Sequence, residues 1–121
     1  MRILCVDDEA DIRTILGLAL GLDPGFDVEI VATGAELIER AGIYVYDAFL
    51  LDGMMPEMDG YELCRRLKSD PRTAAIPVVF LTAKTQREEV ERALSLGAVA
   101  CLTKPFDPLS LAGELRTALG R

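Results

Sequence analysis

Five short, mostly apolar runs alternate along the chain with segments of helical periodicity. The apolar runs cover residues 3–6, 28–32, 48–51, 78–81 and 99–102. Continuous apolar residues over such lengths are typical of parallel strands that helices cover on both faces. The pattern therefore predicts an α/β fold in one domain, a doubly wound parallel sheet built from five strand–helix units over residues 1–121.

Start and stop signals delimit the predicted helices. Ser, Thr, Asp and Asn are preferred at the residue that caps a helix, and proline is preferred at the first helical position. The signals are an apolar stripe over 12–20, a capping box at Thr33 and Glu36, a cap at Asp59, a capping box at Thr85 and Glu88, and a cap at Asp107 before Pro108, whose helix runs to about Leu119.

Polar residues stand at the ends of four of the apolar runs. Asp7 and Asp8 follow the first run, Asp52 the third, Thr82 the fourth and Lys104 the fifth. The carboxyl ends of parallel strands meet at one sheet edge, where open α/β sheets bind ligands. Taken singly, each residue has an ordinary structural role, such as a helix cap at Asp8. Their joint placement predicts a shared site.

The charges of this predicted site do not balance. Two unit charges about 5 Å apart repel by roughly 3 kcal/mol at an effective dielectric constant near 20. Lys104 alone cannot offset Asp7, Asp8 and Asp52. A set of oxygen ligands suits magnesium, which also attracts a phosphoryl group. The sequence thus predicts metal-assisted phosphate chemistry.

Composition narrows the classes of function and partner. The net charge is −7 and there is no histidine, which excludes histidine-based catalysis and disfavours direct nucleic-acid binding. No apolar stretch approaches the roughly 18 residues that a membrane-spanning helix needs, and no signal peptide is apparent. The cysteines Cys5, Cys64 and Cys101 lie in apolar segments, as expected of core residues in a reducing cytoplasm.

The polar motifs resemble those of receiver domains in bacterial two-component response regulators, over the whole chain. The matching motifs are Asp7-Asp8, the segment 51–60, Thr82-Ala83 and Lys104-Pro105-Phe106. The resemblance implies a flavodoxin-like sheet in strand order 2-1-3-4-5. It also implies a receiver domain over 1–121, with no effector domain in this chain.

The resemblance implies a role for each residue of the edge. Asp52 would accept a phosphoryl group from a phosphohistidine on a sensor histidine kinase or a histidine phosphotransfer protein. Asp8, Asp52 and the backbone carbonyl of Met54 would bind Mg²⁺, with Mn²⁺ as a substitute. Asp7 would act through the metal or its water.

The remaining motif residues would hold the phosphoryl oxygens. Lys104 would pair with one oxygen, and the Thr82 hydroxyl would donate a hydrogen bond to another. The resemblance also predicts a cis peptide bond between Lys104 and Pro105. It implies a signalling domain that catalyses its own phosphorylation and dephosphorylation, and not an enzyme with other substrates.

Three positions bear on switching and on the lifetime of the phosphoryl group. The family usually carries Tyr or Phe at the switch position three residues before the lysine, where this chain has Cys101. The signal of phosphorylation would then be transmitted through the loops and the fourth helix, or through a weaker conformational shift of the domain. Met54 and Lys84 match the positions that flank attacking water. Because an apolar Met54 cannot orient water, we predict slow self-dephosphorylation.

Other functions and the output stay open at this point. A haloacid dehalogenase-like phosphatase needs an Asp-x-Asp pattern that Asp7-Asp8-Glu9 lacks, and a nucleotide or flavin module needs a glycine-rich loop there. A degenerate receiver would only bind partners. The output could be a downstream protein target, a missing effector domain, or a homodimer formed through the fourth helix, fifth strand and fifth helix.

Overall fold

Five strands and five helices alternate along the part of the chain that the structure describes. The computed structural model describes residues 1–83 and 87–121. The predicted cap Thr85 and the predicted rate-tuning residue Lys84 lie outside these residues. The elements are β1 (Arg2–Val6), α1 (Ala10–Gly21), β2 (Asp27–Val31), α2 (Gly34–Ile43), β3 (Ala48–Asp52), α3 (Gly60–Ser69), β4 (Val78–Thr82), α4 (Arg87–Ser95), β5 (Ala100–Thr103) and α5 (Leu111–Leu119).

The five strands form one parallel sheet in the order β2-β1-β3-β4-β5, which confirms the predicted fold. Asp52 and Thr82 are the last residues of β3 and β4, whereas the apolar pattern had placed them just after the strands. Asp52 pairs in register with Leu81 of β4, so the two strands end within one residue of each other. The register therefore brings the polar residues to one edge.

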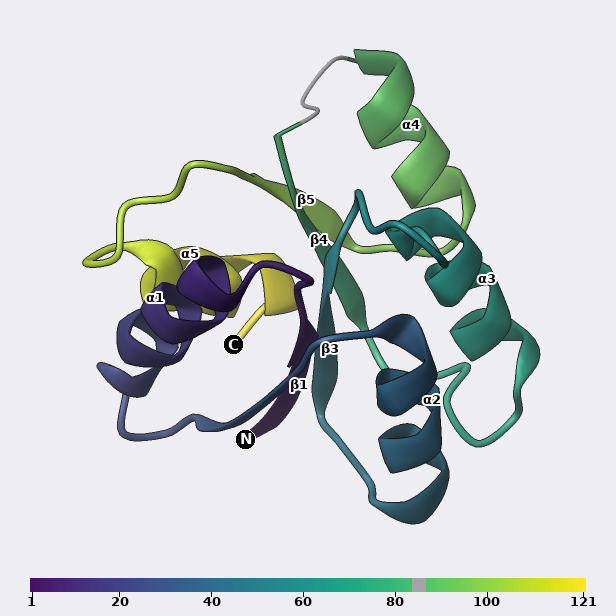
Figure 1. Ribbon diagram of the computed structural model, residues 1–121, viewed down its shortest axis with the longest axis horizontal. Helices are drawn as coiled ribbons and strands as arrows, with labels where there is room; N and C mark the ends of the chain where they lie inside the picture. The colour runs from purple at the N-terminus through teal and green to yellow at the C-terminus, as the bar shows by residue number, and fades with distance from the viewer. Residues whose placement is uncertain (84–86) are drawn as a thin grey trace.

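Helices cover both faces of the sheet. Figure 1 shows α1 and α5 on one face and α2, α3 and α4 on the other. Alternate strand residues enter two separate cores: in β1, Ile3 and Cys5 pack towards α1 and α5, whereas Leu4 and Val6 pack towards α2, α3 and α4. Both sides of the central strands are thus apolar, which explains their continuous apolar sequence.

Two of the predicted helix caps are confirmed. Thr33 Oγ1 accepts the backbone N–H of Glu36 at 3.1 Å, and Asp59 Oδ1 accepts the N–H of Glu62 at 2.9 Å. Each side chain satisfies a backbone donor that has no partner within its own helix. The starts of α2 and α3 therefore follow from local sequence.

The predicted start of the last helix is wrong. Asp107 Oδ1 accepts the N–H of Leu109 at 2.9 Å, and its carbonyl accepts the N–H groups of Ser110 and Leu111. The Asp107 side chain therefore closes a tight turn, and α5 begins only at Leu111. An Asp-Pro pair can begin a helix or a turn, because an aspartate side chain accepts the N–H of the second residue after it equally well in both structures.

The helices are short, with nine to twelve residues in each of the five described. Within the described ranges, none combines the length and the apolar character that crossing a membrane requires. The three cysteines are free; Cys5 and Cys64 are buried, and Cys101 is partly buried.

Candidate functional site

The carboxyl edge of the sheet gathers the predicted polar residues. The carboxylates of Asp7, Asp8 and Asp52 each offer an oxygen within 4.8 Å of the others. Lys104 Nζ lies 2.7 Å from Asp7 Oδ2 and 3.4 Å from Asp52 Oδ1. Thr82 ends the strand beside Asp52 and is buried. The structure thus brings together all five residues that the sequence placed at this edge.

The turn after β1 fixes the acidic pair. Asp7 is 1% exposed, and its Oδ1 accepts the N–H of Glu9 at 2.9 Å. Arg13 Nη1 donates to the Asp7 carbonyl at 2.9 Å, which ties α1 to the turn. Asp8 is exposed and lines a cavity of about 440 Å³ together with Arg13 and Met58. One carboxylate is therefore held inside the protein, and its neighbour faces an open cavity.

Asp52 is buried and carries an altered acidity. Its Oδ1 accepts the N–H of Met54 at 3.1 Å, which turns the chain away from β3. Burial raises the pKa of Asp52 to about 6, and the Asp7 charge adds to this effect, against the opposing effects of the Met54 N–H and Lys104. A buried carboxylate beside another acidic group is a typical feature of a functional site.

Lys104 directly follows β5 and Thr82 ends β4, on the opposite side of β3 from the acidic turn after β1. Burial by itself would lower the pKa of Lys104, but its hydrogen bond to Asp7 and the charges of Asp52 and Asp7 raise it. The backbone N–H of Lys104 donates to the Thr82 carbonyl at 3.0 Å. The Lys104–Pro105 peptide bond is cis, as the resemblance to receiver domains implied. The lysine is therefore charged and fixed in place.

Close packing keeps the Thr82 hydroxyl next to the chain that follows Asp52. A Cβ atom at Gly53 would lie 2.9 Å from Thr82 Oγ1 and 3.1 Å from Thr82 Cβ. Any side chain at Gly53 would therefore force Thr82 or the chain after Asp52 to shift.

The donor set fits a divalent cation. Three carboxylates, of which Asp7 and Asp52 are buried and Asp8 is exposed, and one ammonium leave an excess of two negative charges, and such an excess destabilises the fold unless a cation joins it. The one ammonium is already engaged, because it lies closest to the buried Oδ2 of Asp7. Magnesium prefers oxygen ligands and keeps several waters, so it needs few protein groups.

Two of the other predicted residues lie outside this cluster. Cys101 pairs with Phe80 inside the sheet and packs against the core on the α3 and α4 side. The Met54 side chain is exposed, and its N–H is the group that contacts Asp52. Sequence reasoning missed Arg13, whose role depends on the turn geometry. It also missed Gly53, for which the signal was its place directly after Asp52.

The family model of the response regulator receiver domain matches residues 3–116. The phosphate regulon transcriptional regulatory protein PhoB of Pseudomonas aeruginosa is 39% identical over 123 residues, covering 98% of this chain and 52% of the relative. The chain spans about half the length of the curated relatives that it matches.

Solved receiver structures superpose closely on the chain. Chemotaxis protein CheY4 of Vibrio cholerae has a TM-score of 0.89 at 31% identity, with 97% of both chains covered. The receiver domain of sensor histidine kinase PA1611 from Pseudomonas aeruginosa PAO1 has a TM-score of 0.85 at 30% identity, covering 99% of this chain and 98% of that one. That structure has a magnesium ion coordinated in its active-site cleft. The chain therefore belongs to the response regulator receiver domain family and is a signalling domain of two-component systems.

Proposed function

We propose that Asp52 is the phosphoacceptor of this receiver domain. The observation that supports this is that its carboxylate lies 3.4 Å from Lys104 Nζ and within 4.8 Å of carboxylate oxygens of Asp7 and Asp8. Asp52 thus has beside it both a cation for phosphoryl oxygens and carboxylate ligands for a metal. Phosphoryl transfer needs such positioning and charge neutralisation more than it needs covalent assistance.

In the proposed reaction an Asp52 oxygen attacks the phosphorus of a phosphohistidine on a histidine kinase or a histidine phosphotransfer protein. The new P–O bond forms as the P–N bond breaks, and the electron pair of that bond returns to the imidazole nitrogen. Lys104 binds one phosphoryl oxygen, and Thr82 donates its hydroxyl hydrogen to another. The Met54 N–H holds the carboxylate of Asp52 in place during the attack.

The proposed metal ligands are Asp8, Asp52 and the backbone carbonyl of Met54, with Asp7 acting through a bound water. Magnesium, for which manganese can substitute, supplies positive charge that neutralises the transferring phosphoryl group. The donor chemistry of the three clustered carboxylates supports this assignment. The coordinated magnesium of the PA1611 receiver domain supports it as well.

We expect the phosphoryl group on Asp52 to be long-lived and to control contacts with other proteins. Met54 has an exposed apolar side chain that cannot orient a water molecule, so self-dephosphorylation is slow. Lys84 is the second proposed rate-tuning residue. Phosphorylation switches a protein-interaction surface whose target is a partner protein, an effector domain or a second copy of the chain. We place phosphorylation of this domain and its partner binding in the cytoplasm, where the three free cysteines stay reduced.

Phosphoryl transfer from phosphoramidate, which carries a P–N bond like that of phosphohistidine, tests the proposal. With magnesium present, the protein should gain one phosphoryl group by intact mass, and hydroxylamine should remove it because an acyl phosphate is labile. Asp52→Asn should gain none. The matched control is Asp47→Asn, because Asp47 precedes β3 where Asp52 ends it, and this variant should be labelled normally.

The outcome also separates the alternative functions. Labelling of Asp52→Asn, or sustained release of inorganic phosphate from many phosphate esters, would contradict the proposal and favour a phosphatase. A domain that only binds partners would show no labelling at all. The family match and the intact acidic cluster favour the receiver over both.

A further inference from the structure

Tyr61 of α3 contacts both the strand beside Asp52 and helix α4. Its ring stacks on Phe80 of β4, with centroids 5.2 Å apart and planes inclined by 26°. Its hydroxyl donates to Glu89 Oε2 of α4 at 3.0 Å. The guanidinium of Arg92, also on α4, lies over the same ring, 4.2 Å from its centroid. One buried ring therefore joins β4 to α4.

The β4 side of this contact lies against the backbone of Asp52. A Cβ atom at Gly60, the residue before Tyr61, would lie 2.9 Å from Phe80 Cε1 and would overlap the Asp52 carbonyl oxygen. Gly60 N–H donates to the Gly53 carbonyl at 3.4 Å. Asp52, Gly60 and Phe80 are thus packed in direct contact, so a shift of the Asp52 backbone must displace the start of α3.

The α4 side of the contact lies on a weakly attached helix. Ala93 is the one buried residue among those described in α4, whereas α3 has five: Gly60, Tyr61, Leu63, Cys64 and Leu67. An element with little buried apolar surface moves at a low free-energy cost. Besides the burial of Ala93, the hydrogen bond and the cation–π contact from Tyr61 thus tie α4 to α3.

Strand β5, which lies beside β4, carries no aromatic ring at Cys101 that could join Phe80 to α4. Cys101 of β5 pairs with Phe80 of β4 and packs into the same core. Its thiol is too small to span from Phe80 to α4. Among the described residues, Tyr61 is the aromatic side chain in contact with both Phe80 and α4.

We propose that Tyr61 is a positioning residue that couples the phosphoryl state of Asp52 to the position of α4. A change at Asp52 passes through Gly60 and Phe80 to the Tyr61 ring, and the Glu89 hydrogen bond transmits it to α4. This inference rests on the proposed function, because it assigns to Tyr61 the transmission of an event at Asp52.

Amide chemical shifts, recorded with and without magnesium and beryllium fluoride as the phosphoryl mimic, test the coupling. In the unaltered protein the mimic should shift amides around Asp52 and throughout α4. In Tyr61→Phe the shifts around Asp52 should persist, and those of α4 should be at least about twofold smaller, because coupling between sites is lost with the contact that carries it. Comparing shift changes within each variant removes the static effect of the substitution.

Tyr46→Phe is the matched control. Tyr46 is also buried, its hydroxyl also donates to a glutamate, Glu29, at 2.7 Å, and burial together with that bond raises the pKa of each tyrosine to about 12. The two variants thus lose the same kind of hydrogen bond at different places. Tyr46→Phe should keep the full α4 response.

A second variant approaches the bond from α4. Glu89→Ala should weaken the α4 response as Tyr61→Phe does, and the double variant should show no further loss, since both changes remove one bond. Glu91→Ala, on the exposed face of α4, should have no such effect.

An undiminished α4 response in Tyr61→Phe, or a response around Asp52 with none in α4 of the unaltered protein, would overturn the coupling and leave the proposed function intact. A lack of any response around Asp52 in the unaltered protein would overturn both.

Discussion

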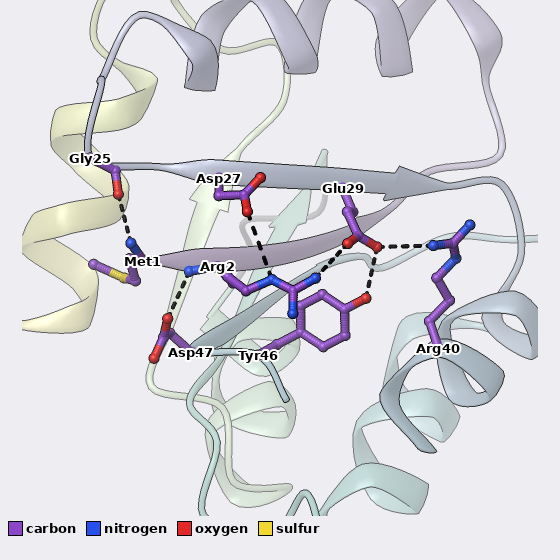
Figure 2. Close-up of polar contacts among 8 residues, drawn as sticks. All are labelled: Met1, Arg2, Gly25, Asp27, Glu29, Arg40, Tyr46 and Asp47. Atoms are coloured by element: carbon purple, nitrogen blue, oxygen red, sulfur yellow. Dashed lines mark hydrogen bonds and ion pairs between the residues drawn. The ribbon is translucent and has the colours of Figure 1, made fainter. Parts of the chain in front are cut away.

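Two charged clusters lie towards opposite ends of the same sheet, and they differ in charge balance. The amino-end cluster consists of Arg2, Asp27, Glu29, Arg40 and Tyr46. The carboxyl-end cluster consists of Asp7, Asp8, Asp52, Thr82 and Lys104. In the amino-end cluster, Glu29 accepts hydrogen bonds from Arg2 at 2.8 Å, Arg40 at 3.2 Å and Tyr46 at 2.7 Å (Figure 2).

The balance shows which cluster serves the fold. Two guanidinium groups match two carboxylates in the amino-end cluster, and Arg2 also lies over the rings of Tyr44 and Tyr46. The carboxyl-end cluster has three carboxylates and one ammonium. A balanced and partly exposed cluster needs no ligand, whereas a buried excess of charge costs stability until a cation binds. Charge imbalance thus distinguishes the functional cluster from the structural one.

The largest expected effect comes from removing the single ammonium of the carboxyl-end cluster. Lys104→Met should slow labelling by phosphoramidate by about 10²–10³-fold, because a positioned charge that stabilises the transferring group is lost. Arg2→Met, which removes a cation from the amino-end cluster, should leave the rate unchanged. The initial rate of phosphoryl incorporation by intact mass measures both. Equal slowing in the two variants would remove the distinction.

The next largest effect is on stability. Replacing a carboxylate by an amide should change the free energy of unfolding in opposite directions in the two clusters. Without metal at pH 7, Asp52→Asn should raise the free energy of unfolding by about 3 kcal/mol, because the pKa of about 6 means that ionised Asp52 is destabilising in the folded protein. Glu29→Gln should lower it by about 1 kcal/mol through weakened bonds to Arg2 and Arg40. Denaturant titration in chelator measures both, and a loss of stability in Asp52→Asn would contradict the comparison.

The smallest effect is a difference in pH dependence. The raised pKa of Asp52, about 6 against an ordinary 3.8, means that its ionisation costs stability above pH 6, and this cost disappears as the pH falls from 6 to below 3.8. The pKa of Glu29 is lowered from 4.5, most strongly by the Tyr46 hydrogen bond, so its contribution is present above pH 4.5 and is lost as the pH falls through the folded-state pKa.

Unfolding titrations of the metal-free protein between pH 7 and pH 3 check this contrast. The stability gap between the unaltered protein and Asp52→Asn should close between about pH 6 and pH 4, because both then carry a neutral group at this position. The gap to Glu29→Gln should stay constant down to about pH 4.5 and close only below it. If both gaps close together, the two carboxylates do not differ as the comparison requires.

The carboxyl-end cluster was predictable from sequence because parallel strands bring their ends to one edge. Asp7, Asp52, Thr82 and Lys104 needed only the apolar runs beside them to be placed. The start of α5 was not predictable, because Asp107 bonds in a turn as readily as it caps a helix.

Contacts between elements far apart in the sequence could not be predicted from the apolar pattern either. The amino-end cluster depends on the β1–β2 register, which pairs Arg2 with Asp27, and on where α2 places Arg40. The Tyr61 contact depends on how α4 packs against α3, and its hydrogen bond joins residues 28 positions apart. Local periodicity carries no information on which side chains meet across such separations.

The two apolar faces of the central strands have a consequence for how the chain finds its pairing. A strand with one polar face resists slipping by one residue, because the slip would bury that face. In β1 and β3 both faces are apolar, so a slip by one residue exchanges one apolar set for another. The carboxylates of Asp7 and Asp52 supply the missing penalty, since a slip would move each buried charge away from its ion pair with Lys104. The residues proposed for signalling thus also favour the correct alignment of the strands that carry them.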